Sequence, residues 1–135
     1  MSDGIETALG IARDPEMGPV VMFGMGGTWI ELFKDVSFAP PFLDHAQAAA
    51  MIKATRVGRL LDGYRGGGPG DCAALGDALV KIGRLASDLG DIIEAVDINP
   101  FLVRRRSEGA FALDALVVLR PPEESAPSGP RSNVP

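Results

Sequence analysis

Three oxygen-bearing side chains interrupt an otherwise apolar stretch in the last third of the sequence. Asp97, Asn99 and Asp114 lie within residues 95–118, AVDINPFLVRRRSEGAFALDALVV, which read as two buried strands joined by a charged turn. An unpaired carboxylate is costly in an apolar interior. Carboxylate and carboxamide oxygens suit a hard cation such as Mg²⁺, which commonly takes one or two protein oxygens and completes its octahedron with water and phosphate oxygens.

The pairing of the two strands decides whether these side chains can act together. If Val103 lies opposite Ala110 in an antiparallel hairpin, Asn99 lies opposite Asp114. Directly opposed side chains are roughly 4.5–5.5 Å apart at Cβ, which is close enough to share one cation. A slip of one residue would destroy the arrangement. The pattern therefore predicts a metal site that depends on this register.

Asp97 precedes Asn99 by two positions, so the alternation of a strand puts both on the same face. The opposite face is predicted to be apolar and buried under a helix, and it comprises Val96, Ile98, Leu102, Phe111, Leu113 and Val117. A second interpretation stays open: Asn99 and Pro100 mark a bulge or a strand end, and both aspartates are solvated.

The surrounding elements form a single domain of 135 residues. Strands are predicted at 5–11, 19–25, 28–33, 92–103 and 110–118, and helices at 45–54 and 71–89, with part of 56–70 helical. Strands on both sides of a helical middle favour an α+β fold with a mostly antiparallel sheet over a doubly wound parallel one. The tail at 120–135 is rich in Pro and Ser and is predicted to be disordered.

The predicted helices carry clear start signals. Asp44 and Asp71 are candidate N-caps, and Gly90 is a candidate stop. In the longer helix, one apolar stripe is predicted to face the sheet, formed by Leu75, Leu79, Ile82, Leu85 and Leu89. Cys72 lies in the first turn of this helix, where a thiol pKa can fall. His45 is outside any motif and is expected to be an ordinary surface histidine.

Composition excludes several classes of function. The net charge of −5 argues against nucleic-acid binding, which normally needs a basic surface. The chain has a single cysteine, so no internal disulfide forms and a cytoplasmic location is the default. The N-terminus lacks the features of a signal peptide, and no apolar run reaches about 18 residues, so no membrane partner is expected.

Several motifs together resemble one family. The stretches are IETALGIARDPEMGPVVMFGMGGTWIELFKDVSFAP, LLDGYRG and VDINPFLV followed by ALDA, in order from about Ile5 to Val118. They look like the second, C-terminal subdomain of the ATP-grasp domain of ADP-forming acyl-CoA synthetases, which are relatives of the succinyl-CoA synthetase β subunit. The resemblance implies that 1–119 is a partial ATP-grasp domain.

The resemblance also implies ligands. Asn99 and Asp114 match the family's Mg²⁺ ligands in the complex with ATP or ADP, and Asp97 matches a supporting position. Arg13, in the family's RDP pattern, and Arg65, in its GxRG pattern, are candidate phosphate contacts. From the residues alone, a turn salt bridge for Arg13 and a flexible loop for Arg65 are equally compatible with the sequence.

The departures from the family are as informative. The first subdomain, with its phosphate-binding lysine, and the CoA-binding part, with its phosphorylated histidine, have no counterpart in this sequence. VSFAPPFL replaces the family's VxFRLAPL, which removes an arginine. The resemblance implies a Mg²⁺–nucleotide-binding portion of a synthetase that needs a partner chain or domain for activity. The alternative is a non-catalytic regulatory or interaction module, such as one joined to an acyltransferase, or a truncated remnant.

Overall fold

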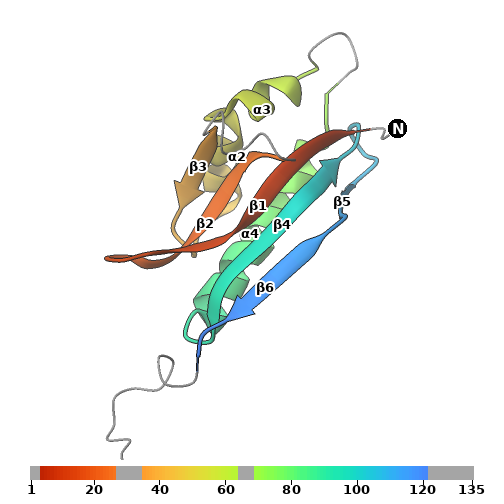
Figure 1. Ribbon diagram of the computed structural model, residues 1–135. Coiled ribbons are helices and arrows are strands. Elements are labelled where there is room, and N and C mark those ends of the chain that lie inside the picture. The colour runs from red at the N-terminus through yellow and green to blue at the C-terminus, as the bar shows by residue number, and fades with distance from the viewer. Residues whose placement is uncertain (1–3, 27–34, 64–68, 122–135) are drawn as a thin grey trace, which may run out of the picture.

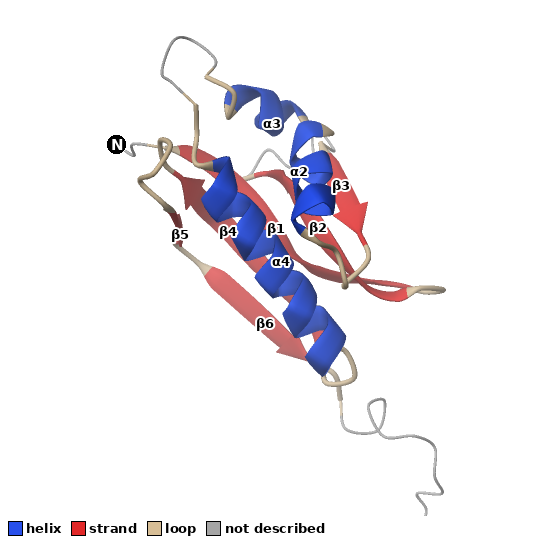
Figure 2. Ribbon diagram, turned by 180° about the vertical axis from the view of Figure 1, so that it is seen from behind, coloured by secondary structure: helices blue, strands red, loops and turns tan. Residues whose placement is uncertain are grey.

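The computed structural model describes residues 4–26, 35–63 and 69–121, which form one antiparallel sheet with helices on a single face (Figures 1 and 2). The elements are β1 (Ile5–Asp14), β2 (Gly18–Met25), β3 (Val36–Ala39), α2 (His45–Lys53), α3 (Arg56–Leu60), α4 (Cys72–Leu89), β4 (Ile93–Val103), β5 (Ala110–Ala112) and β6 (Ala115–Leu119). The strand order is β3-β2-β1-β4, and both β5 and β6 pair with β4. The predicted α+β class is confirmed.

The strands follow the predicted runs with two differences. The predicted strand at 110–118 is divided into β5 and β6 around Leu113 and Asp114. The short strand β3 was not predicted, and the strand expected at 28–33 lies outside the described residues. The turn between β1 and β2 is formed at Asp14, whose carboxylate accepts the backbone N–H groups of Glu16 and Met17 at 2.8 and 2.9 Å.

The predicted helix starts are confirmed. Asp44 forms a reciprocal capping box with Gln47 at the start of α2. Asp71 caps α4 by accepting the N–H of Ala74 at 3.1 Å. The other carboxylate oxygen of Asp71 accepts the N–H of Gly109 at 2.8 Å, so the same side chain also attaches the helix to the turn after β4.

The apolar stripe of α4 is only partly as predicted. Leu75 and Leu79 are fully buried, but Leu89 is 39% exposed. In the second half of the helix the buried positions are Gly83 and Ala86 instead. A Cβ on Gly83 would lie 2.5 Å from the carbonyl oxygen of Pro41, so small residues let the helix backbone approach its neighbours there. The predicted stripe therefore holds at Leu75 and Leu79, while in the second half of the helix the contact face centres on small residues with Ile82 and Leu85 partly buried beside them.

β4 contains a bulge that changes which side chains face the helices. Thr7 pairs with Phe101 and Leu9 pairs with Ile98, so Asn99 and Pro100 together lie opposite one residue of β1. Ile98 on one side of the bulge and Phe101 on the other therefore both pack into the core under the helices. The Thr7 hydroxyl donates to the carbonyl oxygen of Phe101 at 2.8 Å, which satisfies a buried acceptor beside the irregularity.

The predicted apolar face of the hairpin is therefore wrong at its outer strand. Leu113 and Val117 are 57% and 52% exposed, whereas Val96 is 4% exposed. There are two reasons. The bulge breaks the unbroken alternation that the prediction assumed. In addition, α4 packs on β1, β2 and β4, while β6 lies beside the helix rather than beneath it (Figure 2).

Candidate functional site

The predicted register of the β4–β6 hairpin is correct. Val103 pairs with Ala110, and Ile98 pairs with Ala115. Between these pairs, the N–H of Asn99 donates to the carbonyl oxygen of Asp114 at 3.1 Å. Asn99 and Asp114 are thus brought directly opposite each other by the backbone, although Asn99 lies at the bulge that the second interpretation expected.

The hairpin presents Asp97 on the face of the sheet that carries no helix. Val96 and Ile98 pack against the helix side, so Asp97 between them points to the other face. Asp97 and Asp114 are exposed, and Asn99 is half-buried. Two carboxylates and one carboxamide therefore occur close together on the two adjoining segments of the hairpin.

Beside these polar residues, the open face has a floor of small side chains. Asp97 pairs laterally with Gly10 on β1, which in turn pairs with Met22 on β2. A Cβ on Gly10 would lie 2.0 Å from the carbonyl oxygen of Val96, so only glycine fits where β1 and β4 meet. Ala8 and Gly24 pair in the neighbouring row. This floor was not predicted, although the small residues at alternate positions of TALGIA are a signal for it.

The donor set fits a hard cation. Among the described residues, no group of three or more His, Cys, Asp or Glu side chains is placed to hold a metal by itself. Asp97, Asn99 and Asp114 offer fewer protein oxygens than a closed site needs. Mg²⁺ commonly binds in this way, because it keeps waters and takes phosphate oxygens from a nucleotide. The set is therefore suited to a shared metal–nucleotide complex rather than to a structural ion.

Comparison with known proteins identifies the family of this chain. A family model described as the ATP-grasp domain matches residues 1–119. The chain belongs to the ATP-grasp family. It is 38% and 42% identical to the β subunits of the ADP-forming acetate–CoA ligases II and I of Pyrococcus furiosus, over 89% and 86% of this chain. It spans only 51% and 49% of those relatives.

A solved structure matches the fold closely. The dinucleotide-forming acetyl-coenzyme A synthetase 1 of Ca. Korarchaeum cryptofilum, in complex with coenzyme A and Mg-AMPPCP, superimposes with a TM-score of 0.82 and 40% identity. The match covers 89% of this chain and 55% of that one. The chain thus corresponds to about half of an ATP-grasp protein from ADP-forming synthetases.

The two arginines predicted to contact phosphate have different outcomes in this ATP-grasp chain. Arg13 lies on β1, where its guanidinium donates to the carbonyl oxygens of Gly90 and Ile93 and lies 3.7 Å from Glu94. These contacts attach the β1–β2 hairpin to the turn after α4, as a turn salt bridge would. Arg65 lies outside the described residues.

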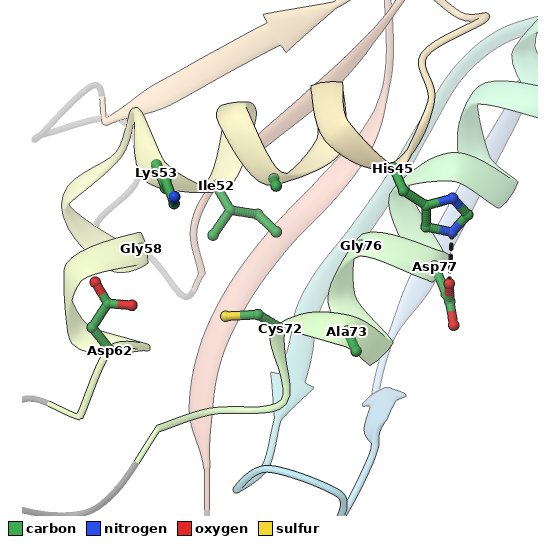
Figure 3. A pocket seen from close by; sticks show the side chains of 10 residues that line it. His45, Ile52, Lys53, Gly58, Asp62, Cys72, Ala73, Gly76 and Asp77 are labelled. Atoms are coloured by element: carbon green, nitrogen blue, oxygen red, sulfur yellow. Dashed lines mark hydrogen bonds and ion pairs between the residues drawn. The ribbon is translucent and has the colours of Figure 1, made fainter.

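A separate cavity of about 470 Å³ lies on the helical side of the domain, between α2, α3 and α4 (Figure 3). His45 Nε2 lies 2.8 Å from a carboxylate oxygen of Asp77 on its rim, and both side chains are exposed, which agrees with a surface role for His45. Cys72 lines the cavity, where burial and the nearby carboxylates of Asp62 and Asp71 raise the pKa of its thiol. The position at a helix start does not lower this thiol pKa, because burial dominates.

None of the predicted metal ligands lines this cavity. The helical face and the open sheet face are thus separate sites. No helix in the described parts of the chain is long and apolar enough to span a membrane.

Proposed function

We propose that this chain is the second, Mg²⁺–nucleotide-binding subdomain of an ADP-forming acyl-CoA synthetase of the ATP-grasp type. One observation carries the proposal: the backbone holds Asn99 opposite Asp114 in the β4–β6 hairpin of a chain whose sequence matches synthetase β subunits. The solved relative bound to Mg-AMPPCP supports a magnesium–nucleotide complex as the ligand. The reaction class is acyl-CoA + ADP + phosphate ⇌ acid + CoA + ATP.

In this proposal each residue of the open face has a simple role. Asn99 and Asp114 hold Mg²⁺, and Asp97 supports them with a further negative charge. Mg²⁺ held by these residues would supply positive charge that offsets the negative charge developing during phosphoryl transfer. Gly10, which pairs laterally with Asp97, projects no side chain toward the ligands. Phosphate contact by Arg65 remains a prediction, and the contacts of Arg13 favour a structural role.

The proposal includes a partner. The chain spans about half of its relatives, so the rest of the ATP site and the CoA-binding part must come from another domain or chain. A cytoplasmic location is part of the proposal and agrees with the single cysteine.

The test is isothermal titration of Mg·ADP and Mg·ATP into the purified chain, alone and with a chain that supplies the first subdomain and the CoA-binding part. We expect nucleotide binding that requires Mg²⁺ and becomes tighter with the partner. We also expect no ATP from acetyl-CoA, ADP and phosphate with this chain alone. Binding that is unchanged by EDTA would contradict the metal assignment. Steady ATP formation by the isolated chain would contradict the need for a partner.

A further inference from the structure

β6 is an apolar edge strand, and no described element covers its outer edge. The four large side chains of this strand are exposed on both of its faces: Leu116 by 61%, Val117 by 52%, Val118 by 42% and Leu119 by 61%. Among the described strands β6 pairs only with β4, so its other edge is free. Proteins normally protect such edges with charges, proline, bulges or a covering element, because a free apolar edge pairs with other strands. None of these protections occurs within 115–119.

Two hydrogen bonds fix which backbone groups face this free edge. Asp114 accepts the N–H of Asn99 at 3.1 Å, and the N–H of Arg120 donates to Ile92 at 2.8 Å. Both residues therefore direct their backbone groups toward the interior of the sheet. Residues two apart in a strand point the same way, so Ala115, Val117 and Leu119 direct their N–H and C=O groups outward.

We propose that β6 pairs with β6 of a second copy of this chain, antiparallel and centred on Val117. In this register Val117 lies opposite Val117 of the second copy, and Ala115 lies opposite Leu119. All of these residues present outward backbone groups, so each pair can exchange both of its N–H···O bonds. Such a contact is two-fold symmetric, as in the commonest class of homo-oligomer.

Charge complementarity selects the centre of this pairing. With Val117 on the axis, Asp114 lies opposite Arg120 of the second copy at both ends of the strand pair. Centring on Ala115 would put Asp114 opposite Leu116, and centring on Leu119 would put Arg120 opposite Val118. Opposite charges across a strand pair are favourable. Arg120 also lies 3.6 Å from Glu94 of its own chain, so Asp114 of the second copy would be its second carboxylate partner. The alternative registers instead place Asp114 or Arg120 opposite an apolar side chain.

The pairing also accounts for the apolar side chains. Leu116 lies opposite Val118 of the second copy on the open face, and Val117 and Leu119 meet their partners on the helix side. Asp114 has two carboxylate oxygens, so it can pair with Arg120 of the second copy and still offer an oxygen beside Asn99. The inference rests on the fold and does not depend on the proposed nucleotide function.

Proline substitution tests the pairing at single-residue resolution. Val117→Pro removes an N–H that faces the free edge, where proline is tolerated in strands. Leu116→Pro is the matched control, because its N–H faces β4. Sedimentation velocity of the wild-type chain over a wide concentration series should show a reversible monomer–dimer equilibrium. Val117→Pro should raise the dissociation constant by at least about tenfold with a similar melting temperature in dilute solution, whereas Leu116→Pro should lower the melting temperature strongly.

A second variant guards against misfolding of the proline variants. Val117→Lys places two ammonium groups opposite each other on the symmetry axis, so it should also give monomers. A wild-type chain that is monomeric at every concentration would overturn the proposal, as would dimers that persist in Val117→Pro and Val117→Lys. Open-ended assemblies larger than dimers would also overturn it, because they require another edge. The proposal would also be overturned if the edge of β6 became covered only when the first subdomain is supplied as a separate chain.

Discussion

The backbone N–H of Asn99 donates to the carbonyl oxygen of Asp114 at 3.1 Å, which places the two residues opposite each other across the β4–β6 hairpin. The contact is between main-chain atoms, so it does not depend on the ligand that the side chains are proposed to bind. A change of side chain at either position should therefore alter binding without altering the pairing.

The first prediction concerns Asp114→Asn. We expect the affinity for Mg·ADP to fall by at least about tenfold, because one anionic ligand is lost. Without metal, the melting temperature should stay the same or rise, since repulsion with Asp97 is relieved. Titration calorimetry and metal-free thermal melts measure the two effects. Asp88→Asn, an exposed change on α4, is the control and should alter neither. A metal-free Asp114→Asn variant that melts well below wild type would mean that the polar face is structural.

The second prediction compares two leucines on one helix. Leu79 is fully buried and Leu89 is 39% exposed. Leu79→Ala should lower the free energy of unfolding by roughly 2–5 kcal/mol because it leaves a cavity in the core. Leu89→Ala should cost under about 1 kcal/mol. Urea titrations of both variants decide the matter, and equal losses would show that α4 is rotated from the position described.

The third prediction compares two glycines of α4. A Cβ on Gly76 would meet no atom within 4 Å, whereas a Cβ on Gly83 would meet Leu43 at 2.4 Å and the carbonyl oxygen of Pro41 at 2.5 Å. Gly76→Ala should stabilise the chain by roughly 0.5–1 kcal/mol, because alanine is the better helix former. Gly83→Ala should destabilise it by roughly 1–3 kcal/mol through overpacking. Thermal melts that gave the reverse order would refute the packing of α4 on the loop before α2.

The fourth prediction concerns Asp71, whose carboxylate accepts N–H groups from Ala74 and Gly109. Asp71→Ala leaves both donors without this partner and should cost roughly 1–3 kcal/mol of stability. Asp44→Ala removes a more exposed cap and should cost about 1 kcal/mol. If chemical denaturation finds Asp44→Ala the more damaging of the two, the link between α4 and the turn after β4 contributes little.

The fifth prediction concerns Cys72, whose thiol pKa is raised by burial and by nearby carboxylates. Alkylation by iodoacetamide at neutral pH should be slower than for an unfolded cysteine, and the rate should rise only at higher pH. The unfolded chain ionises first as pH increases, so the thiol's contribution to stability should decline from the unfolded pKa up to the folded one. A rate profile in the folded protein that matches the urea-unfolded protein would contradict this.

Local chemistry was readable from the sequence. Asp44 and Asp71 cap their helices because a carboxylate just before a helix accepts an unpaired N–H of the first turn. The short charged turn between two apolar runs predicts the hairpin register. This register puts Asn99 opposite Asp114, as the structure has them.

Tertiary packing was not readable in the same way. The bulge at Asn99 and Pro100 needs a partner strand to be defined, and the exposure of Val117 depends on how far α4 extends across the sheet. Leu89 is exposed for a similar reason, because its burial would need another helix or strand to pack over the end of α4. Sequence periodicity indicates which side chains share a face, but not what covers that face.

The position of β6 outside the helical layer also sets where the molecule opens first. Strands beneath α4 should exchange their amide hydrogens only on global unfolding, whereas β6 has few buried side chains to resist local opening. Asp114 is at the boundary between these two regimes, one residue before β6 and hydrogen-bonded to β4. Any ligand that uses Asp114 must therefore hold this boundary closed. Part of its binding free energy would be spent on ordering the strand, and protection of the β6 amides would report occupancy of the site.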